Sequence, residues 1–207
     1  MKTIFLFGDS ITYGSWDMVS SGWASRLRNH LDLINKSPTY YLYALGIPGE
    51  TSGGLRARFE PEFLARQRSD DDSYTIVLAC GANDATWLNG EGRFKVSKED
   101  YITNMRAVIR QAKQYTKDIY SLNITPVNEK FSAEFKGKDK KCMNEYVNTY
   151  NLALSELCEV ENVEIIDIHS VFKDLGANDL LTTDGLHPNA GGHEVIADTV
   201  ISKLVVS

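Results

Sequence analysis

Five short runs of apolar residues recur along the chain, and each ends at a glycine, a proline or a cluster of polar residues. The clearest run, Tyr74 to Cys80, is continuous rather than alternating. Continuous runs of this length are typical of parallel strands that are covered on both faces. The pattern therefore predicts five buried strands, at residues 4–7, 40–45, 74–80, 118–124 and 163–168.

Apolar residues between these strands recur at helical spacing. Helices are expected near residues 23–34, from Thr51 onward, over 143–157 and over 192–205. Another is expected to begin at a capping box at residues 97–100. Pro61 should kink the second helix or begin a separate one. Alternating strands and helices predict right-handed crossovers and an α/β fold with helices on both faces of a parallel sheet.

The stretch 128–141 is polar, with two phenylalanines, and its pattern leaves open whether it forms a mobile lid or an irregular connection. The chain has no internal repeat, linker or low-complexity segment. At 207 residues it is long enough for one sizeable core and short for two. We therefore expect a single domain over residues 1–207.

Composition narrows the class of protein. A hydrophobic content of 43% and a charged content of 24% are typical of a soluble globular protein. The net charge of −6 argues against nucleic acid as the main partner. Three cysteines without paired spacing favour a reducing compartment. The N-terminus lacks a secretory pattern and no stretch is apolar enough to span a membrane, so a cytoplasmic protein is expected. The sequence does not predict the oligomeric state.

Candidate functional residues follow four of the predicted strands, and in three of these turns they are polar. Ser10 comes after the first strand, Gly49 after the second, Asn83 after the third, and Asp184 and His187 after the fifth. Parallel strands end together, and open α/β sheets collect their ligands at this edge. We therefore expect the four turns to meet at one site.

These residue types match the requirements of acyl transfer, which needs a nucleophile, a base, a group that orients the base, and donors for the oxyanion. Ser10 is the candidate nucleophile and His187 the candidate base. Asp184, three residues before His187, is the favoured orienting acid, with Asp167 and Asp179 as alternatives. The backbone N–H groups of Ser10 and Gly49 and the side-chain amide of Asn83 could form the oxyanion hole.

Four motifs occur in order along the chain: Gly8-Asp9-Ser10, Gly49-Glu50-Thr51, Gly81-Ala82-Asn83-Asp84 and Asp184-Gly185-Leu186-His187-Pro188. Their order and intervals resemble the successive blocks of the SGNH, or GDSL-type, hydrolases. The resemblance implies a three-layer α/β/α fold with a flavodoxin-like, five-stranded parallel sheet. It also implies ester or thioester hydrolysis without a metal or other cofactor.

The resemblance would assign Ser10 as the nucleophile and Asp184 and His187 as its partners. Ser10, Gly49 and Asn83 would form the oxyanion hole. One block departs from the family pattern, because Ala44 stands where members often carry asparagine and Pro48 directly precedes Gly49. The expected function is a serine carboxylester hydrolase that acts on small or medium acyl esters or thioesters.

Several alternatives stay open at this point. A serine acyltransferase would use the same residues, and a catalytically idle flavodoxin-like binding module would share the fold. A metal site of Asp167, His187 and His193 is conceivable but lacks a recognisable ligand spacing. An α/β-hydrolase fold is disfavoured because no G-x-S-x-G motif is present. Three aromatic residues could wall an acyl pocket or simply pack: Trp16, Trp87 and Phe94.

Overall fold

The computed structural model describes residues 1–34, 40–68, 73–134 and 139–204. Its centre is a five-stranded parallel sheet in the order β2-β1-β3-β6-β8. Counted along the chain among themselves, these strands follow the order 2-1-3-4-5 that is typical of flavodoxin-like folds. The predicted sheet is therefore confirmed, with strands β1 (Lys2–Gly8), β2 (Tyr40–Gly46), β3 (Ser73–Ala79), β6 (Ile119–Leu122) and β8 (Glu164–Ile166).

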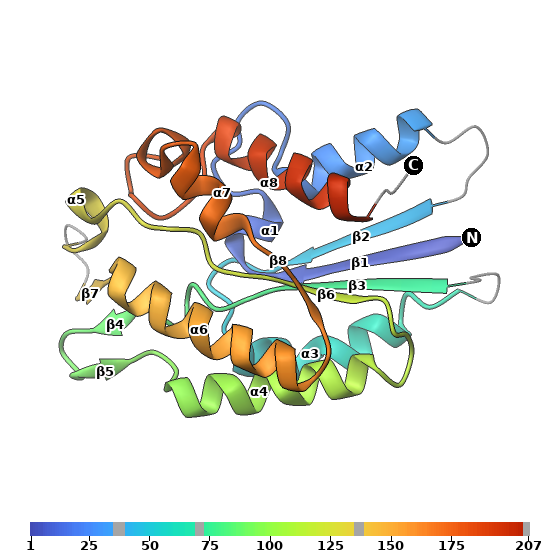
Figure 1. Ribbon diagram of the computed structural model, residues 1–207, viewed down its shortest axis with the longest axis horizontal. Helices are drawn as coiled ribbons and strands as arrows, with labels where there is room; N and C mark the ends of the chain where they lie inside the picture. The colour runs from blue at the N-terminus through green and yellow to red at the C-terminus, as the bar shows by residue number, and fades with distance from the viewer. Residues whose placement is uncertain (35–39, 69–72, 135–138, 205–207) are drawn as a thin grey trace.

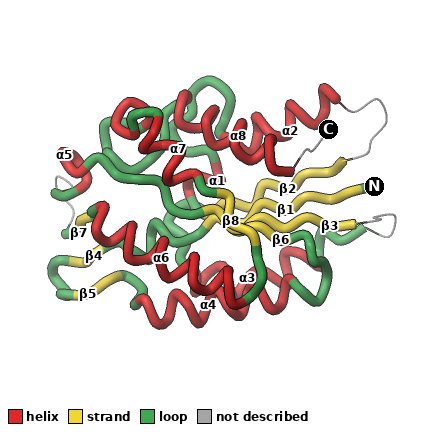
Figure 2. Tube along the Cα trace, in the orientation of Figure 1, coloured by secondary structure: helices red, strands yellow, loops and turns green. Residues whose placement is uncertain are grey.

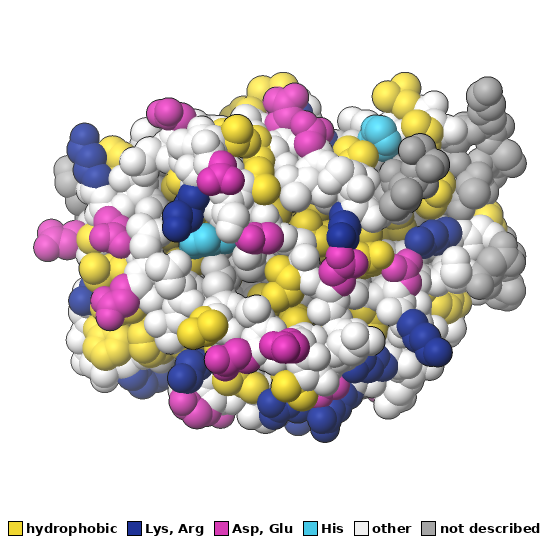
Figure 3. Space-filling view, viewed as in Figure 1, with side chains coloured by type: hydrophobic (Ala, Val, Ile, Leu, Met, Phe, Trp, Pro, Cys, Tyr) yellow, Lys and Arg dark blue, Asp and Glu magenta, His cyan; other side chains and the backbone are white. Residues whose placement is uncertain are grey.

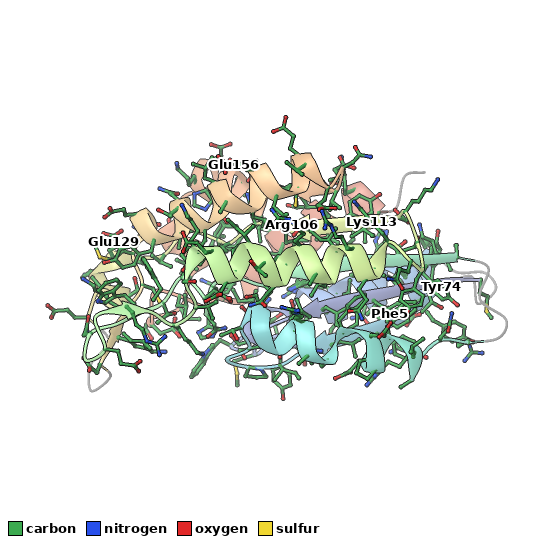
Figure 4. The ribbon with its side chains drawn as sticks, turned by 90° about the horizontal axis from the view of Figure 1, so that it is seen from below. Phe5, Tyr74, Arg106, Lys113, Glu129 and Glu156 are labelled. Atoms are coloured by element: carbon green, nitrogen blue, oxygen red, sulfur yellow. The ribbon has the colours of Figure 1, made fainter. Side chains whose placement is uncertain are left out.

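Helices cover both faces of the sheet and make three layers (Figures 1 and 2). One layer contains α2 (Trp23–Ile34), α7 (Ile168–Asp174) and α8 (Ala190–Leu204). The opposite layer, seen from below in Figure 4, contains α3 (Ser52–Leu64), α4 (Lys98–Ala112) and α6 (Asn144–Val160).

The first strand shows why the apolar runs are continuous. Successive strand side chains point to opposite faces. Phe5 and Phe7 therefore join the core under α3, α4 and α6, while Ile4 and Leu6 join the core under α2, α7 and α8. All four are almost completely buried. Figure 4 shows Phe5 beside Tyr74 of β3, and their ring centroids lie 6.2 Å apart.

Of the two alternatives for Pro61, the start of a separate helix was wrong. It lies inside α3, which continues to Leu64. Proline removes one helical hydrogen bond, but apolar packing on either side of it holds the helix together. Phe59 and Phe63 are both completely buried, and their rings stack 6.1 Å apart on the sheet-facing side.

Several short elements were not predicted from the sequence. A small antiparallel sheet has the order β5-β4-β7 and consists of β4 (Trp87–Leu88), β5 (Arg93–Phe94) and β7 (Lys140–Lys141). The stretch 128–141 supplies β7 and the short helix α5 (Glu129–Ser132). Its residues 135–138 lie outside the described part, so the lid hypothesis is not resolved for them. The remaining short helices are α1 (Ser10–Tyr13) and the 3₁₀ helix η1 (Ala177–Leu180).

The surface carries both signs of charge. On the face shown in Figure 3, lysine and arginine side chains are interspersed with aspartate and glutamate. Within residues 1–34, 40–68, 73–134 and 139–204, no helix has the length and apolar character needed to cross a bilayer.

Candidate active site

Ser10 lies at the carboxyl end of β1, where it begins α1. Asp9 caps this helix, because its Oδ1 accepts a hydrogen bond of 2.9 Å from the Ile11 N–H. A side chain at Gly8 would not fit, since a Cβ there would lie 2.6 Å from the Ala79 carbonyl oxygen. The tight turn after β1 therefore depends on glycine and fixes the position of Ser10.

Ser10, His187 and Asp184 form a continuous chain of hydrogen bonds. The Ser10 Oγ lies 2.9 Å from His187 Nε2, and His187 Nδ1 lies 2.6 Å from Asp184 Oδ2. These contacts join residues 177 positions apart in the sequence. The structure thus brings together the three side chains that the sequence analysis selected.

The second oxygen of Asp184 holds the turn that carries His187. Its Oδ1 accepts hydrogen bonds from the N–H groups of Leu186 and His187, at 2.8 and 2.9 Å, and from the Thr182 hydroxyl at 2.7 Å. Burial disfavours the charged carboxylate, but the bonds from His187, Leu186 and Thr182 outweigh burial and lower the Asp184 pKa below its ordinary value. Asp184 is therefore ionised at neutral pH and oriented toward the imidazole.

The two alternative acids lie elsewhere. Asp167 caps α7 and accepts a hydrogen bond of 2.6 Å from the Asn123 amide. Asp179 lies in η1. Of the three carboxylates, Asp184 is the one that contacts His187.

His193 does not join His187 in a metal site. Its side chain is completely buried, with Nδ1 accepting from the Trp23 N–H at 3.3 Å and Nε2 lying 3.1 Å from the Ser15 carbonyl oxygen. Within the described parts of the chain, no three histidine, cysteine or acidic side chains are grouped so that they could hold a metal ion.

The turn after β2 explains why Pro48 precedes Gly49. The Glu50 N–H donates to the Ile47 carbonyl at 3.1 Å, and Gly49 has a φ of 81°. Proline at the second position and a left-handed glycine at the third are the signature of a type II turn. The Ile47 N–H also donates to the Gly8 carbonyl at 3.0 Å, so this turn is attached to the one that carries Ser10.

Arg58 on α3 ties the same two turns together. It pairs with Glu50 and donates hydrogen bonds to the carbonyls of Gly8 and Leu45, at 3.2 and 2.8 Å. Sequence analysis gave no indication of this role, because Arg58 belongs to none of the four motifs.

Asn83 lies beyond β3, directly before the buried Asp84 in the sequence. Its Nδ2 is 3.4 Å from Asp9 Oδ2. Burial raises the pKa of Asp9 to about 6. Asp84 is completely buried and accepts hydrogen bonds from the Ser52 N–H at 3.0 and 3.1 Å, so it joins the Asn83 turn to the start of α3. Burial also raises the Asp84 pKa.

A pocket of about 290 Å³ opens over these groups, and its lining includes Ser10, Gly49, Asn83 and His187. Trp16 also lines it, with its ring centroid 6.5 Å from that of His187. Trp87 and Phe94 instead pack edge to face, 5.1 Å apart, in the small antiparallel sheet. Of the three aromatic residues considered for the site, Trp16 is the one on its wall.

Comparison with solved structures defines the class of fold. The lipase/acylhydrolase from Enterococcus faecalis superposes with a TM-score of 0.78 at 20% identity, over 99% of this chain and 95% of that one. The chain thus has the α/β fold of the SGNH hydrolases.

Sequence comparison identifies the family. The family model described as "GDSL-like Lipase/Acylhydrolase family" matches residues 6–195. The chain belongs to this family and is a hydrolase acting on ester bonds. Two similar proteins are an acetylxylan esterase from Geobacillus stearothermophilus, 23% identical over 98% of this chain and 93% of the relative, and the human isoamyl acetate-hydrolyzing esterase 1 homolog, 22% identical over 93% and 77%.

Proposed function

We propose that this chain, as a single catalytic domain over residues 1–207, is a serine carboxylester hydrolase that forms an acyl-enzyme at Ser10. The observation that carries the proposal is the unbroken set of contacts from Ser10 Oγ through the His187 ring to Asp184, at 2.9 and 2.6 Å. This arrangement supports activation of a hydroxyl nucleophile at neutral pH.

In the first half-reaction, the Ser10 Oγ attacks the ester carbonyl carbon while His187 Nε2 takes the hydroxyl proton. The imidazolium then gives this proton to the leaving alcohol oxygen as the ester C–O bond breaks. In the second half-reaction, His187 takes a proton from water while the water oxygen attacks the acyl-Ser10 carbonyl carbon. The bond from this carbon to Ser10 Oγ then breaks, the imidazolium returns its proton to Oγ, and the carboxylic acid is released. Asp184 stays ionised throughout and stabilises the imidazolium.

The negative charge on the carbonyl oxygen needs donors that already point at it. Ser10, Gly49 and Asn83 line the same pocket and are proposed as the three donors. An asparagine amide has two N–H bonds. One of them faces Asp9, which leaves the other for the oxyanion.

A short acyl group, acetyl in the first instance, is the proposed substrate fragment. The names of both relatives refer to acetate esters, which supports this choice. The proposed steps use only groups of this chain and water. The three cysteines, Cys80, Cys142 and Cys158, are free and buried, which suits the cytoplasmic location that we propose.

Turnover of p-nitrophenyl acetate, butyrate and octanoate by the wild type and by Ser10→Ala tests this function. We expect the wild type to prefer the shortest ester and the variant to lose at least about 10³-fold in kcat. Undiminished turnover by the variant would contradict the proposal. Product analysis with added ethanol distinguishes the acyltransferase alternative, because a transferase would form ethyl acetate where a hydrolase forms acetate.

A further inference from the structure

Trp16 combines three features that simple packing does not explain. Its backbone has a φ of 72°, which is a genuine outlier for a bulky residue. The residue is 60% exposed, so a large part of it is open to solvent. It also lines the pocket over Ser10, with its ring 6.5 Å from the His187 ring. Strained residues of this kind persist where the surrounding structure fixes them, and they cluster at ligand sites.

The residues on either side of Trp16 are firmly held. The buried carboxylate of Asp17 accepts from three backbone N–H groups, those of Val19, Ser20 and Gly22, at 3.0 to 3.1 Å. It also pairs with Arg26 of α2 at 3.1 Å. These donors outweigh burial and lower the Asp17 pKa to about 2. The loop after α1 is therefore anchored around a charged side chain that stays ionised.

The other neighbour, Ser15, is anchored by His193. The His193 Nε2 lies 3.1 Å from the Ser15 carbonyl oxygen, while Nδ1 accepts from the Trp23 N–H. Since Nδ1 is an acceptor, the proton sits on Nε2 and donates to Ser15. Both ends of the segment 15–23 are thus attached to one buried ring, which fixes the backbone that carries Trp16 at the rim of the pocket.

The position of Trp16 relative to His187 indicates which part of an ester it meets. His187 delivers its proton to the leaving oxygen, so the alcohol part must lie on the imidazole side of the pocket. The oxyanion belongs at Gly49 and Asn83. An aromatic ring beside the imidazole therefore faces the alcohol part and not the carbonyl oxygen.

The chemistry of the wall indicates the kind of alcohol. An indole face carries the negative side of a ring quadrupole and suits a flat surface of weakly positive C–H bonds. One face of a pyranose ring presents such a surface, while its hydroxyls need polar partners at the edge. Ser15 and Lys140 line the same pocket and provide polar groups there.

We propose that Trp16 is a specificity-determining residue that stacks on the sugar ring of an acetylated saccharide, the leaving alcohol of the reaction. This inference rests on the proposed esterase function. Trp16 takes no part in proton transfer, and its contribution ends when the sugar departs. Hydrolysis of the acyl-Ser10 intermediate therefore does not depend on it.

The test compares two acetate esters that share an acyl group: ethyl acetate and a monoacetylated methyl xylopyranoside. Trp16→Ala should lower kcat/KM for the sugar ester, mainly through KM, by about tenfold more than it lowers kcat/KM for ethyl acetate. Trp16→Phe should retain most of the sugar-ester activity. Met18→Ala is the matched control, because Met18 is 91% exposed in the same loop, and it should behave as wild type on both esters.

Binding of xylobiose, which cannot be hydrolysed at an ester, gives a second readout. Indole fluorescence of the wild type should change on titration with xylobiose, and that of Trp16→Ala should not. Equal losses on both esters, or no loss on either, would overturn the role of Trp16. A wild type that hydrolyses ethyl acetate but not the sugar ester would also overturn it while leaving the esterase function intact. Failure on both esters would overturn the esterase function as well.

Discussion

Replacement of Asn83 by alanine removes one of three proposed oxyanion donors and leaves the other two, which are backbone N–H groups, in place. The loss of one such donor typically lowers kcat by about 10²–10³-fold, or about 2.7–4 kcal/mol. Asn83 is partly exposed, so water can replace part of its contribution, and we expect a value near 10²-fold. Because the substrate carbonyl is still neutral when it binds, KM should change little.

The effect on stability should be small and separable. Asn83 loses only the long contact of 3.4 Å to Asp9 Oδ2. A hydrogen bond contributes about 1 kcal/mol, which corresponds to a shift in Tm of about 2–4 °C in a protein of this size. Asn83→Asp should be at least as damaging to kcat as alanine, because it would place a carboxylate against the developing oxyanion and close to Asp9.

The assay measures kcat, KM and Tm on the same preparations with p-nitrophenyl acetate. Asn89→Ala is the control, since Asn89 is an exposed asparagine six positions further along the chain. We expect this control to match the wild type in all three quantities. A normal kcat in Asn83→Ala together with a lowered Tm would refute the oxyanion role and leave Asn83 as a residue that only holds its turn.

The remaining predictions concern the acid that orients His187, activity without a metal ion, and the pH dependence of stability. Asp184→Asn should lose less kcat than His187→Ala, while Asp167→Asn should stay near wild type; the reverse order in a steady-state assay would mean that Asp184 is not the partner of His187. Activity should survive dialysis against a strong chelator, and loss that zinc restores would contradict the serine mechanism. Burial lowers the His193 pKa below 6.5, with Asp17, Arg26 and His187 facing the ring, so the neutral form is favoured in the fold. Its contribution to stability should be complete above pH 6.5 and decline as the pH falls below it, and thermal unfolding from pH 8 to 5 should show a weaker decline in His193→Gln than in the wild type.

Long elements with a clear period were predictable from the sequence. In α4, five apolar residues recur at helical spacing in the sequence, and all are completely buried: Tyr101, Met105, Val108, Ile109 and Ala112. The β4, β5 and β7 strands were not predictable, because each has only two residues and β4 pairs with β7 across more than fifty positions. Such pairs leave no periodic signal within a local window.

The candidate site was likewise predictable only in part. Motifs indicated Ser10, Asp184 and His187. Ser10 follows β1 as expected, whereas α7 and η1 separate Asp184 and His187 from β8. The supporting residues were missed, because their roles come from tertiary contacts. The Thr182 hydroxyl donates to Asp184 within the folded turn, and His193 contacts the carbonyl oxygen of Ser15, which lies 178 positions earlier in the sequence. Of these supporting residues, Thr182 alone could have been suspected from the sequence, because it lies two residues before Asp184.

Covalent trapping tests the central claim most directly. A serine-directed organophosphonate reacts with an activated hydroxyl and stays attached, so mass spectrometry can count adducts and peptide mapping can locate them. We expect one adduct per chain, on Ser10, and none on Ser10→Ala or on the wild type after saturation with substrate analogue. Stoichiometric labelling of a different residue, or of Ser10→Ala, would contradict the assignment of Ser10 as the nucleophile.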